Sequence, residues 1–95
     1  MSDVLQAAVE ALSEKLGGGF DGSVKFEIEG VGAVMVDANG VRVGDEPADC
    51  TLKADADTFQ AMMAGDLNPT AAFMSGKLSV DGDMGAAMRL GSILA

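Results

Sequence analysis

Several residue types that carry catalysis in other proteins are absent or scarce in this chain of 95 residues. It has no histidine, tryptophan or tyrosine and a single cysteine, Cys50. Without histidine, the chain lacks the commonest general base and a common zinc ligand. Cys50 falls in an alternating stretch on the same side as Leu52, which favours a buried structural thiol over a nucleophile. We therefore expect a protein that is not an enzyme, with no catalytic residues, no metal site and no cofactor.

Positive charge and long apolar runs are also scarce, and this argues against two classes of partner. The chain has 6 Lys and Arg against 15 Asp and Glu, a net charge of -9. Nucleic acid needs clustered cations, so no nucleic-acid partner is expected, and membrane contact should be at most transient. No apolar run approaches the roughly 18–20 residues of a membrane span. The lone cysteine, with no basic residues before the first apolar positions, favours a cytoplasmic location.

Apolar residues are plentiful, at 48% of the chain, so we expect a single domain over residues 1–95. An apolar stripe at helical spacing predicts a first helix over residues 3–16, capped by Ser2 or Asp3. Alternating polar and apolar residues then predict four strands, of which the second is apolar on both faces. These strands are expected at residues 23–29, 33–37, 41–43 and 49–55.

Two helices are predicted after the fourth strand. Asp55 or Asp57 can cap the first of them, which Gly65 is placed to end. Asn68 is a second cap, and the proline that follows it suits the first position of a helix. We expect this shorter helix to run to Gly76, because glycine adopts the left-handed conformation easily.

A fifth strand and a last helix complete the predicted order. The strand is expected at residues 77–81, and Asp83 is placed to cap a helix from Met84 to Ala95. The acidic pairs at 55–57 and 81–83 lack the ligand series of a calcium loop, so capping is the better interpretation. The last helix is apolar on most sides and must be covered by its own core, a ligand or a second subunit.

Three motifs in the second half of the chain carry a resemblance to a known family. They are Asp57-Thr58-Phe59, Ala64-Gly65-Asp66-Leu67-Asn68-Pro69 and the run from Ala72 to Asp83, AFMSGKLSVDGD. With the order helix, three strands, connection, strand, two helices, strand, helix, the chain resembles the sterol carrier protein 2 (SCP2) family over essentially its whole length. It differs from the animal carriers in being more acidic and in ending Ile93-Leu94-Ala95 instead of with a peroxisomal Ser-Lys-Leu address.

The resemblance implies an α+β fold, with a five-stranded, mostly antiparallel sheet, helices covering one face and a hydrophobic tunnel between them. It also implies noncatalytic binding and transfer of an apolar lipid such as a sterol, a fatty acid or an acyl-CoA. Two alternatives stay open. One is an accessory protein that presents an apolar intermediate, such as a quinone precursor, to partner enzymes. The other is a dimerisation module that pairs through the C-terminal helix.

Methionine is the residue type that most favours a pocket. The chain has seven, and five of them fall between Met62 and Met88. Flexible, polarizable methionine suits irregular ligands, although the same residues could simply fill a small core. The candidate ligand-binding residues are Phe26, Phe59, Met62, Met63, Phe73, Met74, Met84, Met88 and Leu90. Lys77 and Arg89 are candidates to meet a lipid head group, with solvated surface charge as the alternative.

Free energy limits how such a pocket can exist in a small domain. An empty, rigid apolar cavity of roughly 300 Å³ costs about 7 kcal/mol, against a total stability of about 5–10 kcal/mol. We therefore expect a partly collapsed pocket, a retained lipid or a cavity that is open to solvent. The last helix contains two glycines that weaken it, and it is the expected lid.

Overall fold

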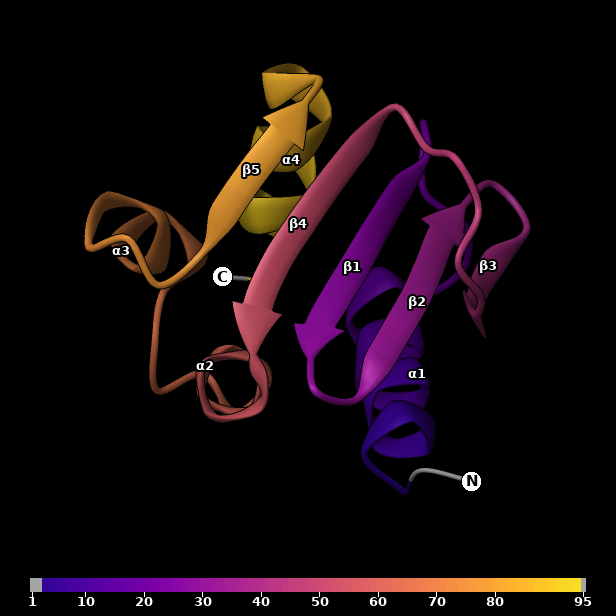
Figure 1. Ribbon diagram of the computed structural model, residues 1–95. Coiled ribbons are helices and arrows are strands. Elements are labelled where there is room, and N and C mark those ends of the chain that lie inside the picture. Colours follow the sequence, from indigo (N-terminus) through magenta and orange to yellow (C-terminus); the bar gives the residue numbers. More distant parts are fainter. Residues whose placement is uncertain (1–2, 95) are drawn as a thin grey trace.

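A computed structural model describes residues 3–94, in which five strands form one mixed sheet with helices against one of its faces (Figure 1). The strand order is β3-β2-β1-β4-β5. The central pair, β1 and β4, is parallel, and the other neighbouring pairs are antiparallel. The strands are β1 Val24–Glu29, β2 Gly32–Asp37, β3 Gly40–Val43, β4 Cys50–Asp55 and β5 Ser79–Gly82. The predicted α+β fold with a five-stranded, mostly antiparallel sheet is confirmed.

Four helices surround one side of this sheet. They are α1 Asp3–Leu16, α2 Ala56–Ala64, α3 Pro69–Met74 and α4 Met84–Leu94. In Figure 1, α1 lies behind β1 and β2, α4 lies behind β4 and β5, and α2 follows the end of β4. The short helix α3 lies beyond the edge strand β5 and contacts α4. Among the described residues, no helix is long and apolar enough to cross a membrane.

The core forms where the strand register aligns apolar side chains on the helix-facing side. Phe26 on β1 is opposite Val34 on β2 and Leu52 on β4, and all three are buried. Phe59 on α2 packs edge-on against Phe26, with ring centroids 4.8 Å apart and an interplanar angle of 79°. This is a favourable aromatic arrangement. The two rings attach α2 to the middle of the sheet.

The other face of the sheet has a small apolar cover of its own over β2. Met35 points away from the helices, between Lys25 and Arg42 on the neighbouring strands, yet it is only 2% exposed. The loop after β3 reaches across it, and Lys25 Nζ holds that loop through Asp45 at 2.8 Å. The stems of such long charged side chains cover apolar surface while their ends stay in water. Both faces of β2 are therefore covered, as its sequence predicts.

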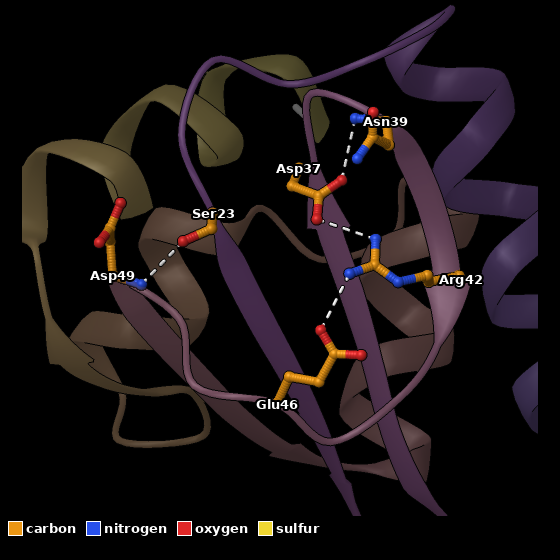
Figure 2. A network of polar contacts seen from close by, with 6 residues as sticks. All are labelled: Ser23, Asp37, Asn39, Arg42, Glu46 and Asp49. Atoms are coloured by element: carbon orange, nitrogen blue, oxygen red, sulfur yellow. Dashed lines mark hydrogen bonds and ion pairs between the residues drawn. The ribbon is translucent and has the colours of Figure 1, made fainter.

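Polar contacts fix the same loop at two further points (Figure 2). Arg42 bridges Asp37 at 2.8 Å and Glu46 at 3.1 Å. The hydrogen bond from Arg42 lowers the pKa of the Asp37 carboxyl below its usual value. At the end of the loop, the backbone N–H of Asp49 donates to the Ser23 hydroxyl at 2.9 Å. The loop between β3 and β4 is thus tied to β1, β2 and β3 before the chain enters β4.

Side chains cap the three helices of the second half, as predicted. A carboxylate oxygen of Asp55 accepts the Thr58 N–H at 2.7 Å, at the start of α2. Asn68 accepts the N–H of Thr70 at 2.8 Å at the start of α3, where Pro69 takes the first position. The third cap, at α4, is an Asp83 oxygen 2.9 Å from the N–H of Gly85. The expected cap at Ser2 or Asp3 and the end at Ala95 involve groups outside the described structure.

The boundary between α3 and β5 differs from the prediction. The helix ends at Met74 with Ser75 as its C-cap, and Gly76 directly after them has the predicted left-handed conformation, with a φ of 81°. The strand β5, however, begins at Ser79 instead of at residue 77. The reason is a shared acceptor, because the N–H groups of Lys77 and Leu78 both donate to the carbonyl of Ala72, at 2.9 and 3.1 Å. These bonds close the end of the helix and delay the strand.

Candidate functional site

An apolar cavity of about 340 Å³ lies between the sheet and the last three helices. Its floor is a row of three side chains on adjacent strands: Phe26 on β1, Leu52 on β4 and Val80 on β5. The row follows from register, since Leu52 pairs with Phe26 on one side and with Val80 on the other. Because paired residues in a sheet point to the same face, the sheet supplies a continuous apolar floor.

Helices α2, α3 and α4 supply the remaining walls. Met62 enters from α2, and Leu78 comes from the turn before β5. The residues from α3 are Pro69, Thr70, Phe73 and Met74, and those from α4 are Met84, Ala87, Met88, Gly91, Ser92 and Leu94. All but Thr70 and Ser92 lack a polar side chain. The volume falls within the roughly 300–1,000 Å³ of known ligand pockets.

The last helix has two apolar faces with different surroundings. Ala86 and Leu90, one turn apart, are buried in the core. Met84, Met88 and Gly91 have the same helical spacing but lie on the adjacent face, where they line the cavity. This arrangement explains why α4 is apolar on most sides: one face meets the core and another meets the cavity.

The cavity is open to solvent on the side of α3 and α4. Four of its lining side chains are exposed, with exposed fractions of 81% for Met74, 70% for Met88, 46% for Met84 and 43% for Phe73. We call these four residues the rim. An open cavity was one of the three expected states, and it avoids the cost of enclosing empty apolar space.

The structure places six of the nine candidate residues on the cavity wall: Phe26, Met62, Phe73, Met74, Met84 and Met88. Phe59, Met63 and Leu90 are not among its lining residues. Phe59 is buried in the core beneath Phe26, and Leu90 is on the core face of α4. Met63 follows Met62 on α2, and one residue turns a helix by about 100°, so the two methionines face different ways.

Sequence reasoning missed the smaller lining residues. Ala87 and Gly91 are three and seven residues after Met84, so helical spacing would have found them. Leu52 and Val80 join the wall through strand pairing, which their sequence positions do not reveal. The full set of missed residues is Leu52, Pro69, Thr70, Leu78, Val80, Ala87, Gly91, Ser92 and Leu94.

The two cationic candidates lie off the wall. Arg89 donates from Nη2 to the carbonyl oxygen of Asp21 at 3.1 Å, and its guanidinium carbon is 5.9 Å from the centroid of the Phe20 ring. Lys77 is exposed in the turn after α3; the pKa of Asp55 is lowered chiefly by the hydrogen bonds from Thr58, to which the charge of Lys77 adds. Neither is among the lining residues of the cavity.

Metal-binding groups do not gather in the described part of the chain, and its one cysteine is shielded. Residues 3–94 contain no cluster of His, Cys, Asp and Glu that could hold a metal ion. Cys50 is fully buried at the start of β4, and burial, followed by the charges of Asp83 and Asp81, raises the pKa of its thiol. A raised pKa keeps the thiol protonated and weakly nucleophilic.

Comparisons with known proteins agree with this geometry. A family model described as the SCP-2 sterol transfer family matches residues 3–95. Sterol carrier protein 2 of Gallus gallus is 41% identical over 93 residues, which is 90% of this chain but 17% of the relative. Hydroxysteroid dehydrogenase-like protein 2 of Danio rerio is 44% identical over 61 residues, 62% of this chain and 15% of the relative. The chain thus spans less than a fifth of either relative.

A solved structure shares the fold. The sterol carrier protein 2 of Aedes aegypti, in complex with the fatty acid palmitate, superposes with a TM-score of 0.79 at 22% identity. The alignment covers 100% of this chain and 97% of that one. The arrangement of five strands and four helices is therefore a known architecture.

Proposed function

Because the chain belongs to the SCP-2 sterol transfer family, we propose that its cavity binds the apolar part of one lipid and releases it unchanged. The observation that carries the proposal is the wall itself, in which thirteen of fifteen lining residues have no polar side chain. Water in such a space finds few hydrogen-bond partners, so displacing it with hydrocarbon is favourable. The palmitate bound to the Aedes aegypti protein is an example of such a ligand on the same fold.

The magnitude of the expected affinity follows from the apolar contact. Each buried methylene contributes about 0.8 kcal/mol, so ten buried groups contribute about 8 kcal/mol before the cost of immobilisation. A net free energy of about 8 kcal/mol would correspond to a Kd of about 1 μM, so after the cost of immobilisation we expect a Kd in the micromolar range or weaker. Exchange of cargo needs such moderate affinity, because a lipid held at picomolar strength would be released too slowly.

The rim gives the lipid a route in and out. Met74 and Met88 are flexible, largely exposed and placed on different helices, so they can separate by side-chain rotation alone. Larger opening would move α4, which contains Gly85 and Gly91. We propose α4 as the lid of the cavity.

Native mass spectrometry of the freshly purified protein tests the function. We expect a species heavier than the polypeptide by the mass of one lipid, which disappears after extraction with organic solvent and returns with added lipid. A second test is displacement of a fluorescent fatty-acid analogue, for which the absence of tryptophan and tyrosine leaves a low background. A protein that neither retains nor takes up any lipid at micromolar concentrations would contradict the proposal.

A second candidate function is supported by the size of the relatives. The matched region is 15% of a dehydrogenase-like relative and 17% of a sterol carrier protein, so this fold occurs beside other segments of longer chains. An accessory role, in which the chain presents an apolar intermediate to a partner enzyme, fits that observation. Co-purification of an enzyme whose turnover depends on this protein would support it, and a carrier that acts alone would argue against it.

A further inference from the structure

No positive charge is found on the wall of the cavity. The chain has six Lys and Arg, and none is among the lining residues. Lys25 and Arg42 pair with acidic residues on the side of the loop after β3, and Lys53 pairs with Glu29 on β1. Arg89 is engaged with the chain segment before β1. Lys15 is in the last turn of α1, and Lys77 is exposed in the turn after α3, directly before Leu78 of the wall. Neither is a lining residue, so an anionic head group inside the cavity would meet no cation on its wall.

Helix N-termini do not replace the missing cations. The three helices around the cavity are capped at their N-termini by Asp55, Asn68 and Asp83, and each of these side chains accepts a hydrogen bond from its own helix. Two of the three caps are negatively charged, so each takes up part of the backbone donors and offsets the positive end of its own helix dipole. Asp83 directly precedes Met84 of the rim in the sequence, so the chain beside this rim residue carries a negative charge.

The polar side chains that do face the cavity are neutral. Thr70 on α3 and Ser92 on α4 each carry a hydroxyl, which can donate to a carbonyl or accept from another hydroxyl. Two hydroxyls can therefore meet the hydrogen-bonding needs of an alcohol, ketone or ester, but they supply no positive charge to balance a carboxylate or phosphate. They are the only polar side chains among the lining residues.

From these three observations we infer that the cavity selects lipids with an uncharged head, such as long-chain or polycyclic alcohols, over lipids that end in a carboxylate or phosphate. The inference rests on the proposed function, because it concerns the ligand of the same cavity. The protein's net charge of -9 acts in the same direction, since it repels anions over about 10 Å at 0.1 M salt.

Three ligands with the same hydrocarbon chain and different heads provide the test: 1-dodecanol, dodecanoate and dodecyltrimethylammonium. Affinities are measured by displacement of an uncharged fluorescent probe at pH 8, where the carboxylate is ionised. Salt is set at about 10 mM and about 150 mM, because the Debye length falls from about 30 Å to about 8 Å between them. All ligands stay below their aggregation concentrations.

We expect 1-dodecanol to bind about tenfold more tightly than dodecanoate at low salt. Added salt should narrow this ratio, since it screens the repulsion of the anion and leaves the alcohol unaffected. The affinity of the cationic ligand should change with salt in the opposite direction to that of the anion. The readout is the ratio of the affinities for 1-dodecanol and dodecanoate. A general effect of salt on apolar binding changes both affinities alike and cancels in this ratio.

A matched pair of variants tests whether charge at the rim determines the preference for uncharged head groups. Met74 is 81% exposed, so its replacement is compatible with folding. Met74→Lys should raise the affinity for dodecanoate relative to 1-dodecanol by about fivefold at low salt, whereas Met74→Gln, polar but uncharged, should leave the ratio unchanged.

The outcomes separate this inference from the function on which it rests. If dodecanoate binds as tightly as 1-dodecanol or more tightly, and weakens as salt rises, the preference for uncharged heads is wrong while lipid binding stands. If none of the three ligands displaces the probe, both the preference and the lipid-binding function are wrong. If Met74→Lys and Met74→Gln change the ratio equally, charge at the rim does not determine the selection.

Discussion

Gly91 offers a substitution that should raise stability and abolish binding at the same time. It lies on the cavity face of α4, and a Cβ at this position would meet only the Cβ of Pro69, at 3.8 Å. That distance is an ordinary van der Waals contact, so alanine fits without a shift. A leucine side chain would extend beyond this point into the cavity.

The expected gain in stability comes from the helix. Replacing glycine by alanine or leucine inside a helix stabilises it by up to about 1 kcal/mol, and somewhat less near a helix end. Three further buried carbons in Gly91→Leu contribute up to about 2 kcal/mol more. For a domain of this size, 1 kcal/mol raises Tm by about 4–8 °C. Gly91→Ala should therefore unfold several degrees higher than the wild type, and Gly91→Leu should be at least as stable as Gly91→Ala.

The two variants should differ in their response to lipid. A ligand at one hundred times its Kd stabilises a protein that binds it by about 2.7 kcal/mol. We expect this shift in the wild type and in Gly91→Ala, which leaves most of the volume free. Gly91→Leu should show little or no shift, because its side chain takes the place of the ligand.

Thermal unfolding followed by circular dichroism, with and without 1-dodecanol, measures both effects in one experiment. Equal ligand shifts in Gly91→Leu and in the wild type would refute this assignment of the binding site. A Gly91→Leu protein that unfolds below the wild type would show that the space beside α4 is too small for a side chain. Gly91→Ala is the control for the effect of helix propensity alone.

Three further predictions follow from the caps, the rim and the buried thiol. Asp55→Ala should lower Tm by several degrees through loss of the α2 cap, whereas Asp55→Asn should keep most of the wild-type Tm. Because the hydrogen bonds from Thr58 depress the pKa of the Asp55 carboxyl, its contribution to stability should be present above about pH 4 and fade as pH falls further. Urea unfolding of the wild type and of Asp55→Asn across this pH range would show the difference. Hydrogen peroxide should oxidise Met74 and Met88 well before the buried Met62, with bound lipid slowing the reaction, and peptide mass spectrometry would contradict this if all three reacted at one rate. Cys50 should react with a thiol reagent only as fast as the protein opens, and immediate labelling under native conditions would show that the thiol is accessible.

Local signals in the sequence predicted most of the elements. Asn68 followed by Pro69 marked the start of α3, and Gly65, with a φ of 83°, marked the end of α2. Such signals work because capping and left-handed turns depend on one or two residues. Gly76, with a φ of 81°, likewise has the predicted left-handed conformation after α3. The start of β5 was wrong by two residues, because the N–H groups of Lys77 and Leu78 donate to the carbonyl of Ala72.

The cavity was harder to predict than the fold, and for a different reason. A large apolar residue can face either a core or a cavity, and its residue type does not distinguish the two positions. Leu90 and Met88 are both apolar residues of α4 that point in different directions from the helix axis. Packing decides that one direction leads to the core and the other to the cavity. Leu52 and Val80 entered the wall because β4 and β5 pair in one register. Long-range pairing of this kind has no local signal.

Phe26 belongs to both the core and the cavity floor. Its ring packs on Phe59 and also faces the ligand space, so a change that reshapes the floor also loosens the attachment of α2. Rim positions such as Met74 and Met88 are free of this conflict because they are largely exposed. Divergence in lipid preference among members of this family should therefore accumulate on α3 and α4, while the strand side of the cavity changes slowly under the demand that the domain stay folded.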